Sequence, residues 1–134
     1  MDAKRLKDIP LFAGLREEDR AAIAGWADEV DVPEGKHLVD QGRFSYEFFV
    51  ILDGAADVLQ DGKRLTSLGP GDVFGEMGLL GEDQLRTASV VATSPMRVIV
   101  MLGRDFAAME RSIPKVAAEI QTICRERTRG ALAD

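Results

Sequence analysis

The chain has 134 residues, 46% hydrophobic and 30% charged, with a formal net charge of −6 at pH 7. This size and composition are typical of one soluble globular domain, and no apolar run is long enough for an ordinary membrane-spanning helix. The negative charge argues against DNA or RNA as the main partner, because nucleic-acid binding draws on positive charge.

The first third of the chain predicts a helix. Apolar residues recur near the 3.6-residue spacing between Leu11 and Val30, which favours an amphipathic helix over that range. The preceding residues are charged and lack the apolar core of a signal peptide. The single cysteine, Cys124, cannot form an internal disulfide. We therefore expect a cytoplasmic protein.

From Val32 to Leu102 the pattern changes to short apolar runs separated by glycine turns. Asp53-Gly54 and Asp61-Gly62 are typical of hairpin turns, because both residue types tolerate positive φ. Short strands at this spacing predict a β-sandwich or barrel. The predicted strands are Lys36–Val39, Glu47–Leu52, Ala55–Gln60, Arg64–Leu68, Arg86–Ala92 and Arg97–Leu102.

Helical spacing returns at the end of the chain. Arg104–Arg111 predicts a short helix, and Pro114 is well placed to begin a second one, since proline is tolerated in a first helical turn. We expect a single domain over residues 1–134. It divides into an N-terminal helical segment (1–31), a β-roll (32–102), C-terminal helices (103–129) and a tail (130–134).

The most informative segment runs from Phe74 to Val90. A Gly75-Glu76 turn opens a short apolar stretch, and Arg86 follows ten residues after Glu76, with Thr87 and Ala88 next. Glycine lets the backbone approach an anion closely, and the arginine fork can pair with two phosphate oxygens. An ionised glutamate only accepts hydrogen bonds, which suits sugar hydroxyls. The pattern predicts a sugar-phosphate site.

This order of residues resembles the phosphate-binding cassette of the cyclic nucleotide-binding domain family. That family includes bacterial catabolite activators, regulatory subunits of cyclic-nucleotide kinases and gating domains of channels. The resemblance extends from Leu11 to Arg127, and the phrase Ile9–Leu15 is similar to the family's opening. It implies a mainly β fold with flanking helices: a jelly-roll sandwich or barrel with an N-terminal helix and two C-terminal helices.

The resemblance also implies roles for the cassette residues. Arg86 would bind the phosphate, Glu76 the ribose, and the Ala88 N–H a phosphate oxygen. Gly75 would let the turn approach the ligand, and Thr87 would bond either the phosphate or a guanine amino group. Structural explanations remain open: Glu76 could cap a short helix, and Arg86 and Thr87 could be ordinary strand residues.

The purine pocket is predicted by the same resemblance. Val58 and Leu65, on facing strands, would pack against the base, with Phe74 beside them unless it belongs to the core. The last helix would act as a lid, and Arg125 is the residue expected to contact the base, with Arg127 and Thr128 as alternatives. Solvated basic residues are also typical of a terminal helix.

The leading hypothesis is a non-enzymatic, stand-alone regulatory module that binds cyclic AMP more readily than cyclic GMP and needs no other cofactor. Its effect would pass through a protein partner or self-association, without direct DNA binding or a membrane. One alternative is a docking domain with an unused pocket; another is an effector domain cut from a larger transcription regulator. A cupin-type metal enzyme is disfavoured because His37 is the single histidine.

Overall fold

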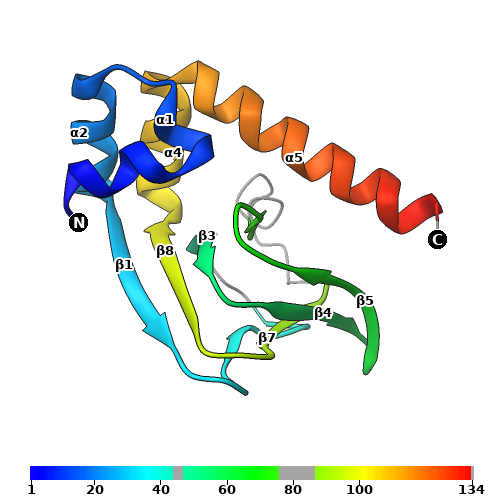
Figure 1. Ribbon diagram of the computed structural model, residues 1–134. Helices are drawn as coiled ribbons and strands as arrows, with labels where there is room; N and C mark the ends of the chain where they lie inside the picture. The colour runs from blue at the N-terminus through cyan, green and yellow to red at the C-terminus, as the bar shows by residue number, and fades with distance from the viewer. Residues whose placement is uncertain (44–46, 76–86, 134) are drawn as a thin grey trace.

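Two antiparallel sheets form the body of the protein, shown in Figure 1 as a computed structural model. The structure describes residues 1–43, 47–75 and 87–133, with side chains as far as Ile123. Within these residues each sheet has four strands, in the orders β1-β8-β3-β6 and β2-β7-β4-β5. The strands are β1 (Ala27–Val32), β2 (His37–Val39), β3 (Glu47–Asp53), β4 (Ala56–Gln60), β5 (Lys63–Leu68), β6 (Val73–Phe74), β7 (Ser89–Ala92) and β8 (Met96–Leu102).

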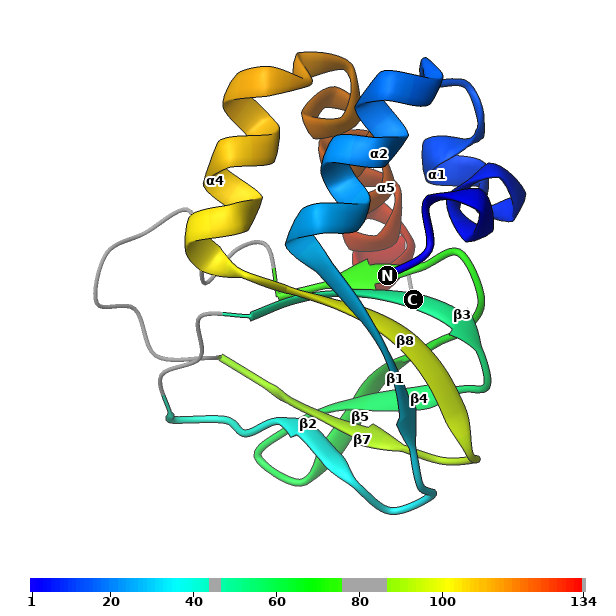
Figure 2. The same cartoon turned by 90° about the vertical axis from the view of Figure 1, so that its left-hand side faces the viewer.

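Helices from both ends of the chain gather on the outer face of the first sheet (Figure 2). The mainly β fold with flanking N-terminal and C-terminal helices is therefore confirmed. None of the described helices is long and apolar enough to cross a membrane. The helices are η1 (Ala3–Asp8, a 3₁₀ helix), α1 (Pro10–Ala13), α2 (Glu17–Trp26), α4 (Gly103–Ser112) and α5 (Pro114–Ala133).

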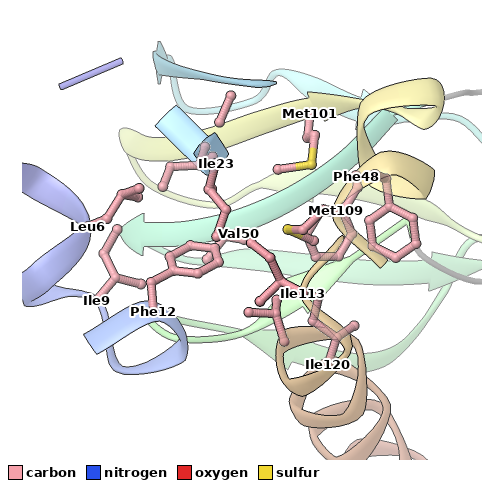
Figure 3. Close-up of a cluster of buried hydrophobic side chains, with 14 of the residues drawn as sticks. Leu6, Ile9, Phe12, Ile23, Phe48, Val50, Met101, Met109, Ile113 and Ile120 are labelled. Carbon is pink, nitrogen blue, oxygen red and sulfur yellow. The ribbon is translucent and has the colours of Figure 1, made fainter. Parts of the chain in front are cut away.

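The first sheet is buried on both faces, so the molecule has two apolar cores. Phe48 and Val50 of β3 point into the helical layer, where they meet Met109 and Ile120 (Figure 3). The alternate residues, such as Phe49, join the core between the sheets. Side chains of a strand alternate between faces, which explains why β3 is apolar throughout. The rings of Phe48 and Phe106 lie 4.7 Å apart and couple β3 to α4.

Two sequence predictions about helix ends are wrong. The range predicted as one helix, Leu11–Val30, is divided into α1 and α2 by residues 14–16, and α2 ends at Trp26. Ala27–Val32 is a strand paired along its length with β8. Ladder pairing between residues about 70 positions apart overrides the helical spacing here. At the other end, α5 continues to Ala133, so residues 130–133, predicted as a tail, are helical.

An ion-pair cluster joins the N-terminal helix to the first sheet. Arg5 pairs with Glu29 through both guanidinium branches, at 3.0 and 3.1 Å. Arg97 on β8 contacts Glu29 at 3.4 Å and Asp31 at 2.9 Å. The hydrogen bond and charge of Asp31, with the charge of Glu29, raise the pKa of Arg97 above its ordinary value. The cluster keeps η1, β1 and β8 together at the surface.

Arg20 offers a stability prediction. Its side chain is buried, and its guanidinium donates to the carbonyl oxygens of Ala13 and Leu15, which end the first helical turn. Arg20→Met keeps most of the volume but leaves both carbonyls without this donor. We expect a loss of about 1–3 kcal/mol in the free energy of unfolding, measured in urea. Arg16→Met is the matched control, because Arg16 is exposed and pairs with its acidic neighbours Glu18 and Asp19; equal losses would contradict the argument.

Candidate anion-binding site

The predicted cassette begins at the end of one sheet and finishes at the start of the other. β6 belongs to the first sheet and β7 to the second. The structure describes the two ends of this crossing, Gly75 and Thr87. Glu76 and Arg86 lie outside the described residues, so their roles stay predictions.

Gly75 has the backbone conformation that the prediction requires. Its φ is +95°, in the region that side chains disfavour. Directly before it, Val73 and Phe74 pair with Val50 and Phe49 of β3. The chain thus leaves the first sheet through a turn for which glycine is the suitable residue.

Thr87 and Ala88 lie just before β7. Thr87 is exposed and Ala88 is half-buried, and the strand begins only at Ser89. The strand predicted over Arg86–Ala92 is therefore shorter in its described part. The Gln60 side chain donates from Nε2 to the Thr87 carbonyl oxygen at 3.2 Å. The Gln41 N–H donates to Ser89 Oγ at 2.8 Å.

The sequence predicts neither glutamine as part of this region. Both lie on surface segments of ordinary polar composition, in the β2–β3 connection and at the end of β4. The Gln60 side chain and the Gln41 backbone N–H reach the start of β7 because β2, β4 and β7 are neighbours in the second sheet. An Asp-Gly turn directly after Gln60 is the one local signal that a hairpin holds it at an edge.

Val58 and Leu65 lie on adjacent strands, as expected, but not opposite each other. Val58 pairs with Thr66, and Leu59 pairs with Arg64, so Leu65 is the extra residue at a register shift. Such a bulge can redirect a side chain, and Leu65 is 51% exposed. Val58 is half-buried against the core between the sheets. An exposed leucine beside a half-buried valine provides apolar surface on β4 and β5.

Phe74 belongs to the core between the sheets. It is 4% exposed, and its ring stacks on that of Phe49 with centroids 4.6 Å apart. This is the structural explanation that the sequence left open for Phe74. Its packing anchors β6 directly before Gly75, and contact with a ligand stays a prediction.

Arg125 lies on α5, whose C-terminal half extends above β4 and β5 (Figures 1 and 2). The side chains of this half are outside the description, so the predicted contact with a base remains a prediction. The helix itself runs over the side of the roll that carries Val58 and Leu65.

A separate groove opens between the edge strands β1 and β2. Its volume is about 580 Å³, and its lining includes Trp26, Val30, Phe49, Val100 and Leu102. Of the predicted ligand-binding residues whose side chains the structure describes, none lines this groove. Among the residues that the structure describes, no cluster of three or more histidine, cysteine or acidic side chains could hold a metal ion.

The sequence of this chain is similar to those of proteins that bind or respond to cyclic nucleotides. The family model of the cyclic nucleotide-binding domain matches residues 29–112, which include the cassette and every strand except the first two residues of β1. The cyclic AMP receptor protein of Thermus thermophilus is 30% identical over 131 residues, covering 94% of this chain. A cAMP-dependent protein kinase regulatory subunit of Aspergillus niger is 35% identical over 102 residues, covering 75% of the chain. The cGMP-dependent protein kinase egl-4 of Caenorhabditis briggsae is 30% identical over 127 residues, covering 90%.

The structural comparison agrees with these matches. The crystal structure of the Thermus thermophilus catabolite activator protein superimposes with a TM-score of 0.76 at 30% identity, covering 91% of this chain and 59% of that one. The chain spans 60% of the Thermus receptor protein, 24% of the Aspergillus subunit and 16% of the egl-4 kinase. Fold, family model and relatives all lead to one assignment: this chain belongs to the cyclic nucleotide-binding domain family.

Proposed function

We propose that this chain is a non-enzymatic regulatory module that binds a 3′,5′-cyclic purine nucleotide, with cyclic AMP preferred. The observation that carries the proposal is the cassette from Gly75 to Ala88, which lies inside the region matched by the family model. The positive φ of Gly75 at one end and the polar start of β7 at the other support it.

Each cassette residue has a distinct task in this proposal. Arg86 pairs with the charged phosphate oxygens and also balances the carboxylate of Glu76, which would otherwise repel the anion. Glu76 accepts hydrogen bonds from the ribose hydroxyl. The Ala88 N–H donates to a phosphate oxygen. Val58 and Leu65 supply apolar surface for the purine, and Arg125 on α5 covers it.

The proposed response to ligand is a rearrangement of the C-terminal helices. α5 is fastened to the helical core by Val116 and Ile120, whereas its later turns run above β4 and β5 (Figure 1). A ligand can shift such a helix only if it binds one arrangement more tightly than the other. The output then passes to a protein partner or a second copy of the chain, without direct DNA contact.

Calorimetry with cyclic AMP, cyclic GMP and linear 5′-AMP tests the proposal. We expect both cyclic nucleotides to bind with one site per chain and cyclic AMP to bind more tightly. Linear 5′-AMP should bind much more weakly, because its dianionic phosphate does not present the compact cyclic ester. Equal binding of linear and cyclic nucleotides, or no binding, would contradict the proposal and favour a docking domain with an unused pocket.

Thr87→Ala tests the base preference. If the exposed hydroxyl of Thr87 contacts a guanine amino group, the variant should lose about two- to tenfold in affinity for cyclic GMP, the range of one neutral hydrogen bond. Affinity for cyclic AMP should fall less. Equal losses would assign Thr87 to the phosphate alone, and a parent preference for cyclic GMP above about a hundredfold would overturn the cyclic AMP preference, since one such bond supplies only about tenfold.

A second candidate role is that of the effector domain of a longer regulator. The coverage of 60% of the Thermus receptor protein favours this reading. The nucleotide site would be the same, and only the attached output would differ. The complete reading frame distinguishes this role from the stand-alone module.

A further inference from the structure

The pairing of β4 with β7 ends one step before the predicted anion site. The last paired residues are Leu59 and Ser89. One more step along the antiparallel ladder would bring Gln60 opposite Ala88, but Ala88 lies outside the strand. Instead, the Gln60 side chain donates from Nε2 to the Thr87 carbonyl oxygen at 3.2 Å. A side-chain amide thus continues the pairing where the backbone ladder stops.

That hydrogen bond also controls the direction of the next N–H. The Thr87 carbonyl and the Ala88 N–H belong to one planar trans peptide, so they point in opposite directions. Holding the carbonyl toward Gln60 therefore holds the N–H away from it. Within the described part of the chain the Ala88 N–H has no hydrogen-bond acceptor, although Ala88 is half-buried. Backbone N–H groups ordinarily take an acceptor as they are withdrawn from water, so this donor is available to a bound ligand.

We propose that Gln60 is a positioning residue for the anion site, which orients the Thr87–Ala88 peptide so that the Ala88 N–H donates to the ligand phosphate. The inference rests on the proposed function and names a residue outside the cassette that tunes it. Hydrogen bonding at the carbonyl polarises the whole amide, so it also strengthens the N–H as a donor. Gln60 would then contribute to affinity without touching the ligand.

Gln41 anchors the hairpin that carries Gln60. Its side chain donates to Asp61 Oδ1 at 2.9 Å and accepts from the Asp61 N–H at 2.8 Å. Asp61 has a φ of +53°, the conformation that a two-residue Asp-Gly hairpin turn requires, and these bonds hold the turn in it. Gln41 therefore supports the hairpin as a whole, whereas Gln60 acts on one peptide.

The two glutamines form a matched pair of variants. Gln60→Ala should weaken cyclic AMP binding about three- to tenfold, because the N–H loses its fixed direction and part of its polarity. Gln41→Ala removes two side-chain bonds from the same exposed edge but keeps the bond to Thr87, so its loss should be smaller. Equal losses for the two variants would mean that hairpin loosening is the cause, and the proposal would be wrong.

Phosphorothioate analogues supply a readout that a merely structural role would not change. In one of the two diastereomers of cyclic AMP, sulfur replaces the oxygen that faces the Ala88 N–H. Sulfur is a weak acceptor, so for that isomer Gln60→Ala should cost less than about twofold, while the other isomer keeps the full loss. The same loss for cyclic AMP and both isomers would refute the orientation argument.

The outcomes separate this inference from the function on which it rests. A parent protein that binds no cyclic nucleotide refutes the proposed function, and the inference falls with it. A parent that binds cyclic AMP while Gln60→Ala binds it equally well refutes the inference alone.

Discussion

Arg86→Ala is expected to lower the affinity for cyclic AMP about 30-fold to several thousand-fold. Truncating one partner of a buried, hydrogen-bonded charge pair typically costs about 2–5 kcal/mol, and every 1.4 kcal/mol is about tenfold in affinity. The loss arises because the phosphate charge and the Glu76 carboxylate would be left together without a cation. Calorimetry of parent and variant measures it, and the free energy of unfolding without ligand should change little.

Arg111→Ala is the matched control for this variant. Arg111 is exposed in the last turn of α4 and carries the same charge, so its removal tests the effect of net charge alone. Its affinity for cyclic AMP should stay within about twofold of the parent, since distant exposed charges are screened at physiological salt. An Arg86→Ala variant that binds as tightly as Arg111→Ala would show that the cassette is not the phosphate site.

Gly54→Ala should strongly destabilise the β-roll. Gly54 has a φ of +89°, and a Cβ there would lie 2.4 Å from the carbonyl oxygen of Pro95 and 2.8 Å from the Met96 Cα. Adding the left-handed penalty of about 1–2 kcal/mol to an overpacking cost of about 1–3 kcal/mol predicts a loss of about 2–5 kcal/mol. Urea unfolding of the purified variant measures this loss.

Gly62→Ala separates the conformational penalty from the overpacking cost. Gly62 lies in the hairpin between β4 and β5 with a similar φ of +78°, but, apart from its two chain neighbours, no described atom lies within 4 Å of the position that a Cβ would take there. It should therefore lose only the conformational part, about 1–2 kcal/mol. If both alanine variants lose the same stability, the close approach between the Gly54 turn and Pro95 does not contribute, and the packing argument is wrong.

The strands could be predicted where local pattern and tertiary environment agree. The apolar run predicted as Glu47–Leu52 is β3, and both predicted Asp-Gly turns have positive φ at the glycine. Asp61-Gly62 is a hairpin turn between β4 and β5, whereas the hairpin predicted at Asp53-Gly54 is wrong, because β3 and β4 belong to different sheets. β1 could not be predicted, because Trp26 and Val30 continue the helical spacing of apolar residues, and only the pairing with β8 decides the conformation. β6 has only two residues, too few for any periodic signal.

Some residues of the candidate site could also be predicted from the sequence, and others could not. Gly75 could be predicted because a turn that needs positive φ favours glycine at that position. Gln60 could not, because its role depends on a side chain reaching a carbonyl 27 residues away. The bulge at Leu65 is likewise invisible before the register of β4 and β5 is known. A local backbone requirement restricts the residue type at one position, so it can be read from the sequence. A side-chain contact between strands restricts no single position in this way.

A crystal structure of the complex with cyclic AMP tests the central claim most directly. We expect one ligand per chain at the crossing from β6 to β7. A phosphate oxygen should lie within about 3.2 Å of the Ala88 nitrogen, with Arg86 on the phosphate, Glu76 on the ribose and the purine against Val58 and Leu65. Cyclic AMP seated instead in the groove beside Trp26, with Arg86 and Ala88 free of it, would contradict the account.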